Sequence, residues 1–114
     1  MKMSALAVVA EFGAKWTAHD LEGTLEWCTQ DCRFDSTDPA PDGTLCVGIE
    51  EIRANWQHIF ENSESIFEVE ETFAADDRVI QRWRYSWGTG HVRGIDLFKV
   101  RDGKVSEKFS YVKG

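Results

Sequence analysis

The second half of the chain, "SIFEVEETFAADDRVIQRWRYSWGTGHVRGIDLFKVRDGKVSEKFSYV" (residues 65–112), decides the fold. β-Branched and aromatic residues fill four runs, which the turn sequences "ADD", "GTG" and "RDG" separate. Such runs, divided by short turns, are typical of strands that pair with their chain neighbours. The stretch therefore predicts four long antiparallel strands in a meander.

The first half of the chain has a different period. Apolar residues recur there at the three- and four-residue steps of a helix in two segments. The first segment follows Ser4, a candidate N-cap, and comprises Ala5, Val8, Val9, Phe12 and Trp16; the second comprises Ile49, Ile52, Trp56, Ile59 and Phe60. Asp20 can cap a shorter helix with Leu21, Leu25 and Cys28 on its inner side. A short strand at "CRFDS" (residues 32–36) and a ribbon at residues 45–47 complete the expected elements.

These elements predict a single α+β domain over residues 1–114, because the chain is long enough for one core and too short for two. Three helices precede the meander and are expected to cover one face of a strongly curved antiparallel sheet. A curved sheet whose concave side is only partly filled leaves an open mouth. A small ligand is expected to bind there.

Composition limits the kinds of partner and the cellular compartment that are expected for the chain. The formal net charge of −7 repels phosphate backbones, so nucleic acid is not expected as a partner. The longest apolar stretch, "ALAVVA", is too short to span a membrane, and the first residues lack the order of a signal peptide. A cytoplasmic location is the expectation. The cysteines, Cys28, Cys32 and Cys46, are expected to be reduced core residues, with no metal and no cofactor.

Three segments resemble a known family in its own order: "AHDLEGTLEWCTQDCRF", "VGIEEIRANWQHIF" and "VRGIDLFKVRDGKVSEKFSYV". The chain resembles the nuclear transport factor 2-like (NTF2-like, or cystatin-like) superfamily. Within it, the chain is similar to the SnoaL-like group, which includes bacterial ketosteroid isomerases, limonene epoxide hydrolases and polyketide cyclases. The resemblance implies a cone-shaped sheet with three N-terminal helices packed on its concave face. It leaves the activity open, since this fold hosts many unrelated functions.

The resemblance implies Asp96, in "GIDLF", as the leading catalytic residue. The isomerases have at that position an aspartic acid that donates a hydrogen bond to the developing enolate. Their second donor, a tyrosine, corresponds here to Phe12, which has no hydroxyl. Their general base corresponds either to Asp35 or to Asp38, and both are equally acceptable as ordinary turn residues.

Two other mechanisms of the group are disfavoured. Epoxide hydrolases and polyketide cyclases use a carboxylate on the last strand, where this chain has Ser110. His19 is a further candidate for proton transfer, although a histidine at a helix end commonly binds the last carbonyls. His58 lies half a turn from the apolar stripe of its helix and is expected to be solvated.

The length of the "GTG" turn decides which residues of the preceding strand lie on the same face as Asp96. A two-residue connection places Gln81, Trp83 and Tyr85 on the same face as Asp96, where an apolar wall favours the neutral acid. A three-residue connection places Arg82 and Arg84 there, and a guanidinium favours the carboxylate. The first register is preferred, because burying aromatic rings is more favourable than burying guanidinium groups.

The expected lining of the cavity is aromatic with few polar groups, which suits a flat apolar ligand. It comprises Phe12, Trp16, Phe34, Trp56, Phe60, Phe73, Trp83, Tyr85, Phe98, Lys108 and Ser110. The alternative for the rings is that they simply pack on one another. The alternative for Lys108 is that its ammonium extends to the mouth instead of approaching Asp96.

The outer face of the sheet is expected to mix apolar and basic residues: Ile80, Ile95, Leu97, Phe109 and Tyr111 with Arg82, Arg84, Arg93 and Lys99. An apolar face of this kind needs cover, and a homodimer through it is expected. Three functions remain open: an enzyme that moves protons on an apolar carbonyl or polycyclic molecule, a ligand-binding protein without catalysis, and an interaction module with a filled cavity.

Overall fold

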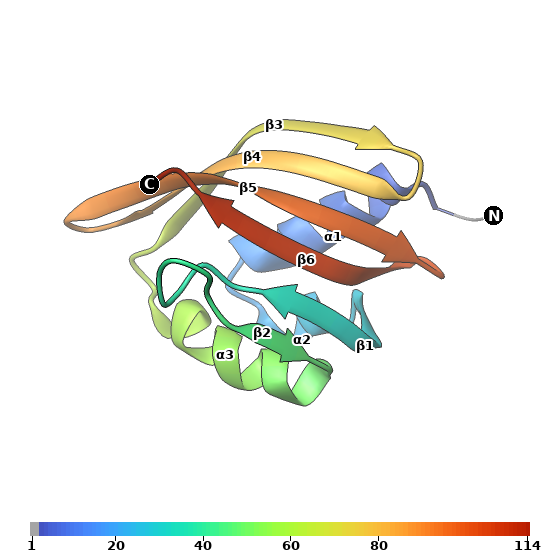
Figure 1. Cartoon of the computed structure of the whole chain (residues 1–114), viewed down its shortest axis with the longest axis horizontal. Coiled ribbons are helices and arrows are strands. Elements are labelled where there is room, and N and C mark those ends of the chain that lie inside the picture. Colours follow the sequence, from blue (N-terminus) through green and yellow to red (C-terminus); the bar gives the residue numbers. More distant parts are fainter. Residues whose placement is uncertain (1–2) are drawn as a thin grey trace.

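A computed structural model describes residues 3–114 of the chain and shows the expected α+β fold (Figure 1). The helices are α1 (Ala5–Thr17), α2 (Leu21–Leu25) and α3 (Ile49–Glu61). The strands are β1 (Cys28–Asp35), β2 (Leu45–Val47), β3 (Ile66–Ala75), β4 (Arg78–Trp87), β5 (Gly90–Arg101) and β6 (Lys104–Val112). The predicted meander of four long strands is confirmed.

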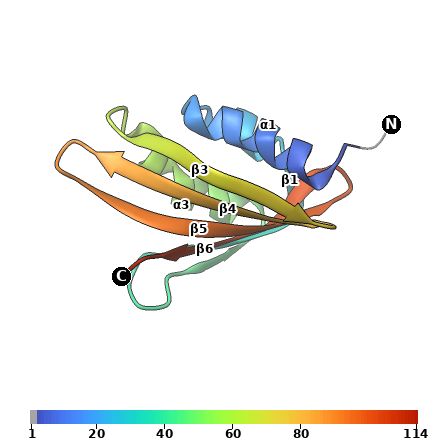
Figure 2. The ribbon, with the colours of Figure 1, turned by 90° about the horizontal axis from the view of Figure 1, so that it is seen from above.

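The strands form one curved, unclosed sheet in the order β2-β1-β6-β5-β4-β3. Neighbouring strands are antiparallel except β1 and β6, which are parallel, so the sheet is mixed and not antiparallel throughout. Helix α1 lies over one face of the sheet (Figure 2) and contacts β3, β4, β5 and β6, while α3 contacts β1 and β2. One face of the sheet is thus covered and the other is open.

Side-chain caps begin the first two helices as the sequence predicts. Ser4 Oγ accepts from the Ala7 amide at 3.1 Å, and Asp20 Oδ1 accepts from the Gly23 amide at 2.9 Å. The prediction that Cys28 belongs to the second helix is wrong, because Cys28 is the first residue of β1. It lies opposite Val105, whose amide donates to the Trp27 carbonyl at 2.7 Å. Pairing with β6 therefore outweighs local helical periodicity at this point.

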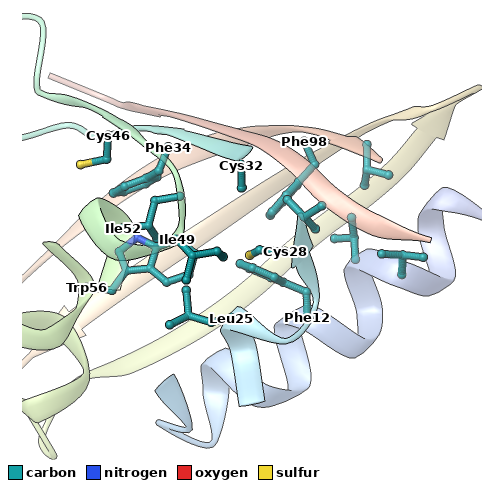
Figure 3. Close-up of a cluster of buried hydrophobic side chains, with 14 residues drawn as sticks. Phe12, Leu25, Cys28, Cys32, Phe34, Cys46, Ile49, Ile52, Trp56 and Phe98 are labelled. Atoms are coloured by element: carbon teal, nitrogen blue, oxygen red, sulfur yellow. The ribbon is translucent and has the colours of Figure 1, made fainter. Parts of the chain in front are cut away.

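The core lies between the helices and the sheet. Figure 3 shows Phe12 of α1, Trp56 of α3 and Phe98 of β5 pointing into this space. The Phe12 ring lies 5.9 Å from that of Trp56 and 5.5 Å from that of Phe98, in edge-to-face contact. All three side chains are almost fully buried. They fill one end of the concave face.

The three cysteines are free and buried in or beside this core. A hydrogen bond with the Cys32 thiol, together with burial, raises the pKa of the Cys28 thiol. A thiol with a raised pKa is a poor nucleophile. Cys28 therefore acts as a small core residue.

A β-bulge at Glu70 changes the faces of β3. Val69 lies opposite Trp83, but Glu71 lies opposite Arg82, so one extra residue stands between two adjacent pairs. A bulge of this kind reverses the alternation of the residues that follow it. The prediction that Phe73 lines the cavity is wrong for this reason. Phe73 lies opposite Ile80 on the outer face and is 51% exposed.

Among residues 3–114, none of the helices is both long and apolar enough to cross a membrane.

Candidate active site

A cavity of about 400 Å³ lies on the concave side of the sheet, beside the packed core. Its volume lies within the range of small-molecule sites. Aromatic side chains from four elements line it: Trp16, Phe34, Phe67, Trp83, Tyr85 and Trp87. The polar groups of the wall fall into two sets. The first set comes from the loop after β1 and from α3, and the second from the sheet. The first comprises Ser36, Thr37, Asp38, Asn55 and His58, and the second comprises Asp96, Lys108 and Ser110.

The strand register explains why Asp96 lies at the inner edge of this cavity. Asp96 is opposite Gln81 on β4 and Ser110 on β6, and Gln81 is opposite Thr72 on β3. These residues form a polar row across the concave face. The next row toward the core includes Val79 and Phe98, and the next row toward the cavity includes Trp83 and Gly94. Asp96 thus lies where the packed core ends.

Asp96, Lys108 and Ser110 form one buried cluster. Lys108 Nζ lies 3.2 Å from Asp96 Oδ2, which is the distance of an ion pair, and Ser110 Oγ donates to Asp96 Oδ1 at 2.6 Å. Lys108 Nζ also donates to Ser110 Oγ at 3.1 Å. Asp96 is 1% exposed and Lys108 is 5% exposed. Each group therefore has a partner, as buried charges require.

A count of protons shows which groups remain available to a ligand. The Ser110 hydroxyl has one proton, which Asp96 accepts, while its oxygen accepts from Lys108. An ammonium has three N–H groups and a carboxylate has about four acceptor positions. Lys108 thus has one N–H beyond its two contacts, and Asp96 keeps lone pairs. The Lys108 nitrogen also lies 4.7 Å from the Trp16 ring and 4.8 Å from the Phe34 ring, both in the cavity wall.

The register between β4 and β5 is the expected one. Gly88 and Thr89 form a two-residue connection, and Gln81 is opposite Asp96. Arg82 lies on the outer face, where it pairs with Glu70 and Glu71. The apolar wall from β4 is present, but a cation reaches Asp96 from β6: the Lys108 ammonium approaches the carboxylate, which is one of the two positions that the sequence allows. The alternative in which the Lys108 ammonium extends to the mouth is also excluded.

Gly94 leaves the space that the Trp83 ring occupies in the cavity wall. A β-carbon at Gly94 would lie 2.8 Å from the Trp83 ring and 2.2 Å from the Tyr111 carbonyl oxygen, both too close for real atoms. Only glycine lets the Trp83 ring lie across β5 at this point. The ring takes up the space beside Asp96 that Gly94 leaves.

The other acid–base candidates lie apart from the cluster. His19 has a φ of 58°, and its Nε2 lies 3.0 Å from Ser65 Oγ, next to a space of only about 10 Å³. Asp35 lies opposite Phe109, on the outer face. Asp38 is exposed in the cavity wall. Neither His19 nor Asp35 is part of the wall of the larger cavity.

The predicted lining is only partly that of the structure. Phe12, Trp56 and Phe98 belong to the core, and Phe60 lines only the small space beside His19. Trp16, Phe34, Trp83, Tyr85, Lys108 and Ser110 line the larger cavity. Phe67, Trp87, Asn55 and His58 were missed. The period-two alternation before the bulge would have pointed to Phe67, whereas His58 is exposed as expected and yet lies in the cavity wall.

Within residues 3–114, no three His, Cys, Asp or Glu side chains come together as a metal-binding group. The cluster of Asp96, Lys108 and Ser110, here called the sheet cluster, contains one carboxylate, one amine and one hydroxyl. Its chemistry is that of hydrogen bonding, proton transfer and amine addition.

Comparison with known proteins agrees with this architecture. The model of the SnoaL-like domain family matches residues 9–108. An NTF2-like protein of unknown function from Mesorhizobium loti has a TM-score of 0.87 and 35% sequence identity, over 96% of this chain and 91% of that chain. No curated protein matches the chain.

Two more distant structures have functional names. A candidate ketosteroid isomerase from Kribbella flavida has a TM-score of 0.79 at 14% identity, over 96% of this chain and 78% of that one. A candidate polyketide cyclase from Sinorhizobium meliloti has a TM-score of 0.79 at 15% identity, over 96% and 100% of the two chains. At these identities the likeness extends to the fold alone.

Proposed function

Since the chain belongs to the SnoaL-like domain family, we propose that it is an enzyme that moves a proton on an apolar carbonyl or polycyclic compound bound in the cavity. Asp96 is the acid–base group in this proposal. The reaction is of the isomerase, cyclase or hydrolase type. The names of the two neighbours from Kribbella flavida and Sinorhizobium meliloti support the isomerase and cyclase types.

The observation that supports the proposal is a buried carboxylate in the wall of an aromatic cavity. Rings of Trp16, Trp83 and Tyr85 offer apolar surface to a flat substrate. The sheet cluster is then the polar point that orients it. A carbonyl oxygen beside Lys108 would meet the unused N–H of the ammonium, and a neighbouring C–H would face Asp96.

The chemistry follows from this placement. Asp96 accepts a proton from the carbon next to the carbonyl and returns it at another atom. The ammonium of Lys108 stabilises the negative charge that develops on the carbonyl oxygen, because it is already in place and desolvated. Lys108 thus supplies the donor that Phe12 lacks. Ser110 keeps Asp96 in one orientation.

Turnover of a panel of apolar ketones, lactones and epoxides by the Asp96→Asn variant tests the proposal. Asparagine has a similar volume but cannot accept the proton, so turnover of every responsive substrate should fall by about 100-fold or more. Asp42→Asn, in the exposed loop before β2, is the matched control and should keep full activity. Unchanged turnover in Asp96→Asn, with a normal far-ultraviolet circular dichroism spectrum, would refute the role of Asp96.

One observation favours a second candidate, a ligand-binding protein without catalysis. Asp96 is already paired with Lys108 and Ser110, so it can serve as an anchor for a polar group without reacting. Tight binding of a ligand by the wild type, with no turnover of any panel member, would select this candidate. The third function, a module with a filled cavity, has no support, because about 400 Å³ is open beside Asp96.

A further inference from the structure

Lys108 is the only lysine among residues 3–114 that is buried, which is unusual for a lysine side chain. A lysine normally keeps its ammonium in water, because removing the charge from water is costly. Lys104, on the same strand, is exposed in this ordinary way. The Lys108 nitrogen is instead placed against two cavity rings and within reach of a carboxylate.

The surroundings of this nitrogen combine apolar rings with one carboxylate that can accept its proton. The apolar Trp16 and Phe34 rings lie within 5 Å, Asp96 Oδ2 lies at 3.2 Å, and Ser110 Oγ lies at 3.1 Å. Asp96 Oδ2 faces the Lys108 nitrogen and can accept a proton from it. The Nζ–H···Oδ2 contact is the direct route for that proton. A desolvated lysine of this kind is suited to attack carbonyl carbon.

We propose that Lys108 binds its substrate covalently, as a Schiff base with an aldehyde or ketone. The inference rests on the proposed function, since it takes the same cavity and the same carbonyl class, and it adds a named nucleophile. It also narrows the substrate to an aldehyde or ketone on an apolar frame. Lactones and epoxides are excluded, because neither gives an imine.

Asp96 balances the protons of the two steps. It first takes a proton from the Lys108 ammonium. The free amine adds to the carbonyl carbon, and one of its two N–H protons passes to the carbonyl oxygen to give a neutral carbinolamine. Protonated Asp96 then gives its proton to the carbinolamine hydroxyl, the C–O bond breaks, and water leaves. The iminium that remains carries the positive charge that the ammonium had, and Asp96 is again a carboxylate.

The iminium then assists the proton transfer proposed above. Its positive nitrogen withdraws electrons from the adjacent carbon and makes that C–H bond more acidic. Asp96, which is within reach of Nζ, can accept this proton. One carboxylate therefore serves both the formation of the imine and its use.

Reductive trapping tests the inference without knowledge of the natural substrate. The full chain is incubated near neutral pH with 2-naphthaldehyde or 2-acetylnaphthalene and sodium cyanoborohydride, which reduces imines. Intact mass should rise by the mass of the probe less one oxygen atom, and peptide mapping should place the adduct on Lys108 in preference to exposed Lys104. Naphthalene, which has no carbonyl, should suppress the labelling of Lys108 by competition but not that of Lys104.

Variants separate a nucleophile from a structural residue. Lys108→Arg keeps a positive charge near Asp96 and should abolish labelling at position 108. If this variant does not fold, the double variant Asp96→Leu/Lys108→Met, which leaves no buried charge, should also abolish labelling at position 108. Labelling of Lys108 no faster than that of Lys104 in the wild type would overturn the inference.

Binding of the same probes distinguishes a failure of the Schiff-base inference from a failure of the proposed function. Quenching of tryptophan fluorescence by 2-acetylnaphthalene, reversed by naphthalene, reports occupation of the cavity, because Trp16 and Trp83 line it. Quenching without a Lys108 adduct would refute the Schiff base and leave non-covalent proton transfer standing. The absence of both quenching and labelling would count against the cavity as a carbonyl site altogether.

Discussion

Asp96 depends on two side chains of a single neighbouring strand. Lys108 and Ser110 both come from β6, and their pairing with β5 fixes the distances to the carboxylate. The charge of Lys108 is therefore stable in the interior only while Asp96 is present, and the reverse also holds. This mutual dependence predicts strong coupling between substitutions at the two positions.

Lys108→Met alone should lower the free energy of unfolding by about 3 kcal/mol, because it leaves the Asp96 carboxylate buried without its cation. The double variant Asp96→Leu/Lys108→Met should lose much less, since neither charge remains. Urea unfolding of both variants measures the difference. Lys104→Met, on an exposed residue of the same strand, is the control and should change stability by less than about 0.5 kcal/mol. Equal losses in the single and double variants would contradict the coupling.

At the scale of the strand, the bulge at Glu70 decides which aromatic residue of β3 meets the cavity. Phe67 lies opposite Tyr85, with its ring 5.6 Å from that of Trp83 and 6.1 Å from that of Trp16. Phe73 comes after the bulge and lies on the other face. Two phenylalanines of one strand thus have opposite roles.

Replacement of each phenylalanine should therefore have unequal effects. Phe67→Ala removes ring contacts in the cavity wall and should cost about 2 kcal/mol of stability, with weaker binding of 2-acetylnaphthalene. Phe73→Ala should leave the affinity for the probe unchanged. Fluorescence titration and urea unfolding of the two variants provide the comparison. Loss of probe binding in Phe73→Ala would mean that β3 has the register of an unbulged strand.

The elements differ in how far the sequence predicts them. The stripe of α1, the cap at Asp20 and the four long strands follow from local patterns, and each pattern agrees with the fold. The parallel pairing of β1 with β6 joins segments far apart in the sequence. The bulge at Glu70 gives no local signal of its own. Both are set by tertiary contacts, so the side of the sheet that Phe73 occupies could not be read from alternation alone.

The site shows the same division. Alternation and the two-residue turn predict that Asp96 shares a face with Trp83, and they predict that Lys108 and Ser110 share a face with each other. Whether Lys108 reaches Asp96 depends on the rotamer of a long side chain, which the sequence does not specify. The sequence therefore leaves both positions of the ammonium open, and the structure has the one beside Asp96.

At the scale of the whole molecule, the outer face of the sheet has no cover within residues 3–114. Register places Phe73, Ile80, Leu97 and Phe109 in one row across β3, β4, β5 and β6. The adjacent row contains Ile95, which is 39% exposed, and Tyr111, which is 55% exposed, beside Arg82. Contiguous apolar area of this kind marks an interaction surface.

We propose that two copies of the chain associate through this face. Because the face contains Arg82 and Arg93 as well as Glu70 and Glu71, opposite charges can meet when the same surface is used twice about a two-fold axis. Light scattering after size exclusion should give twice the mass of one chain. Ile95→Glu should give the mass of one chain, because it buries a charge in the apolar part of the shared surface. Leu6→Glu, on an exposed residue of α1, should stay dimeric. A wild type that remains monomeric at millimolar concentration would contradict the proposal and show that the outer sheet face is stable in water without a partner.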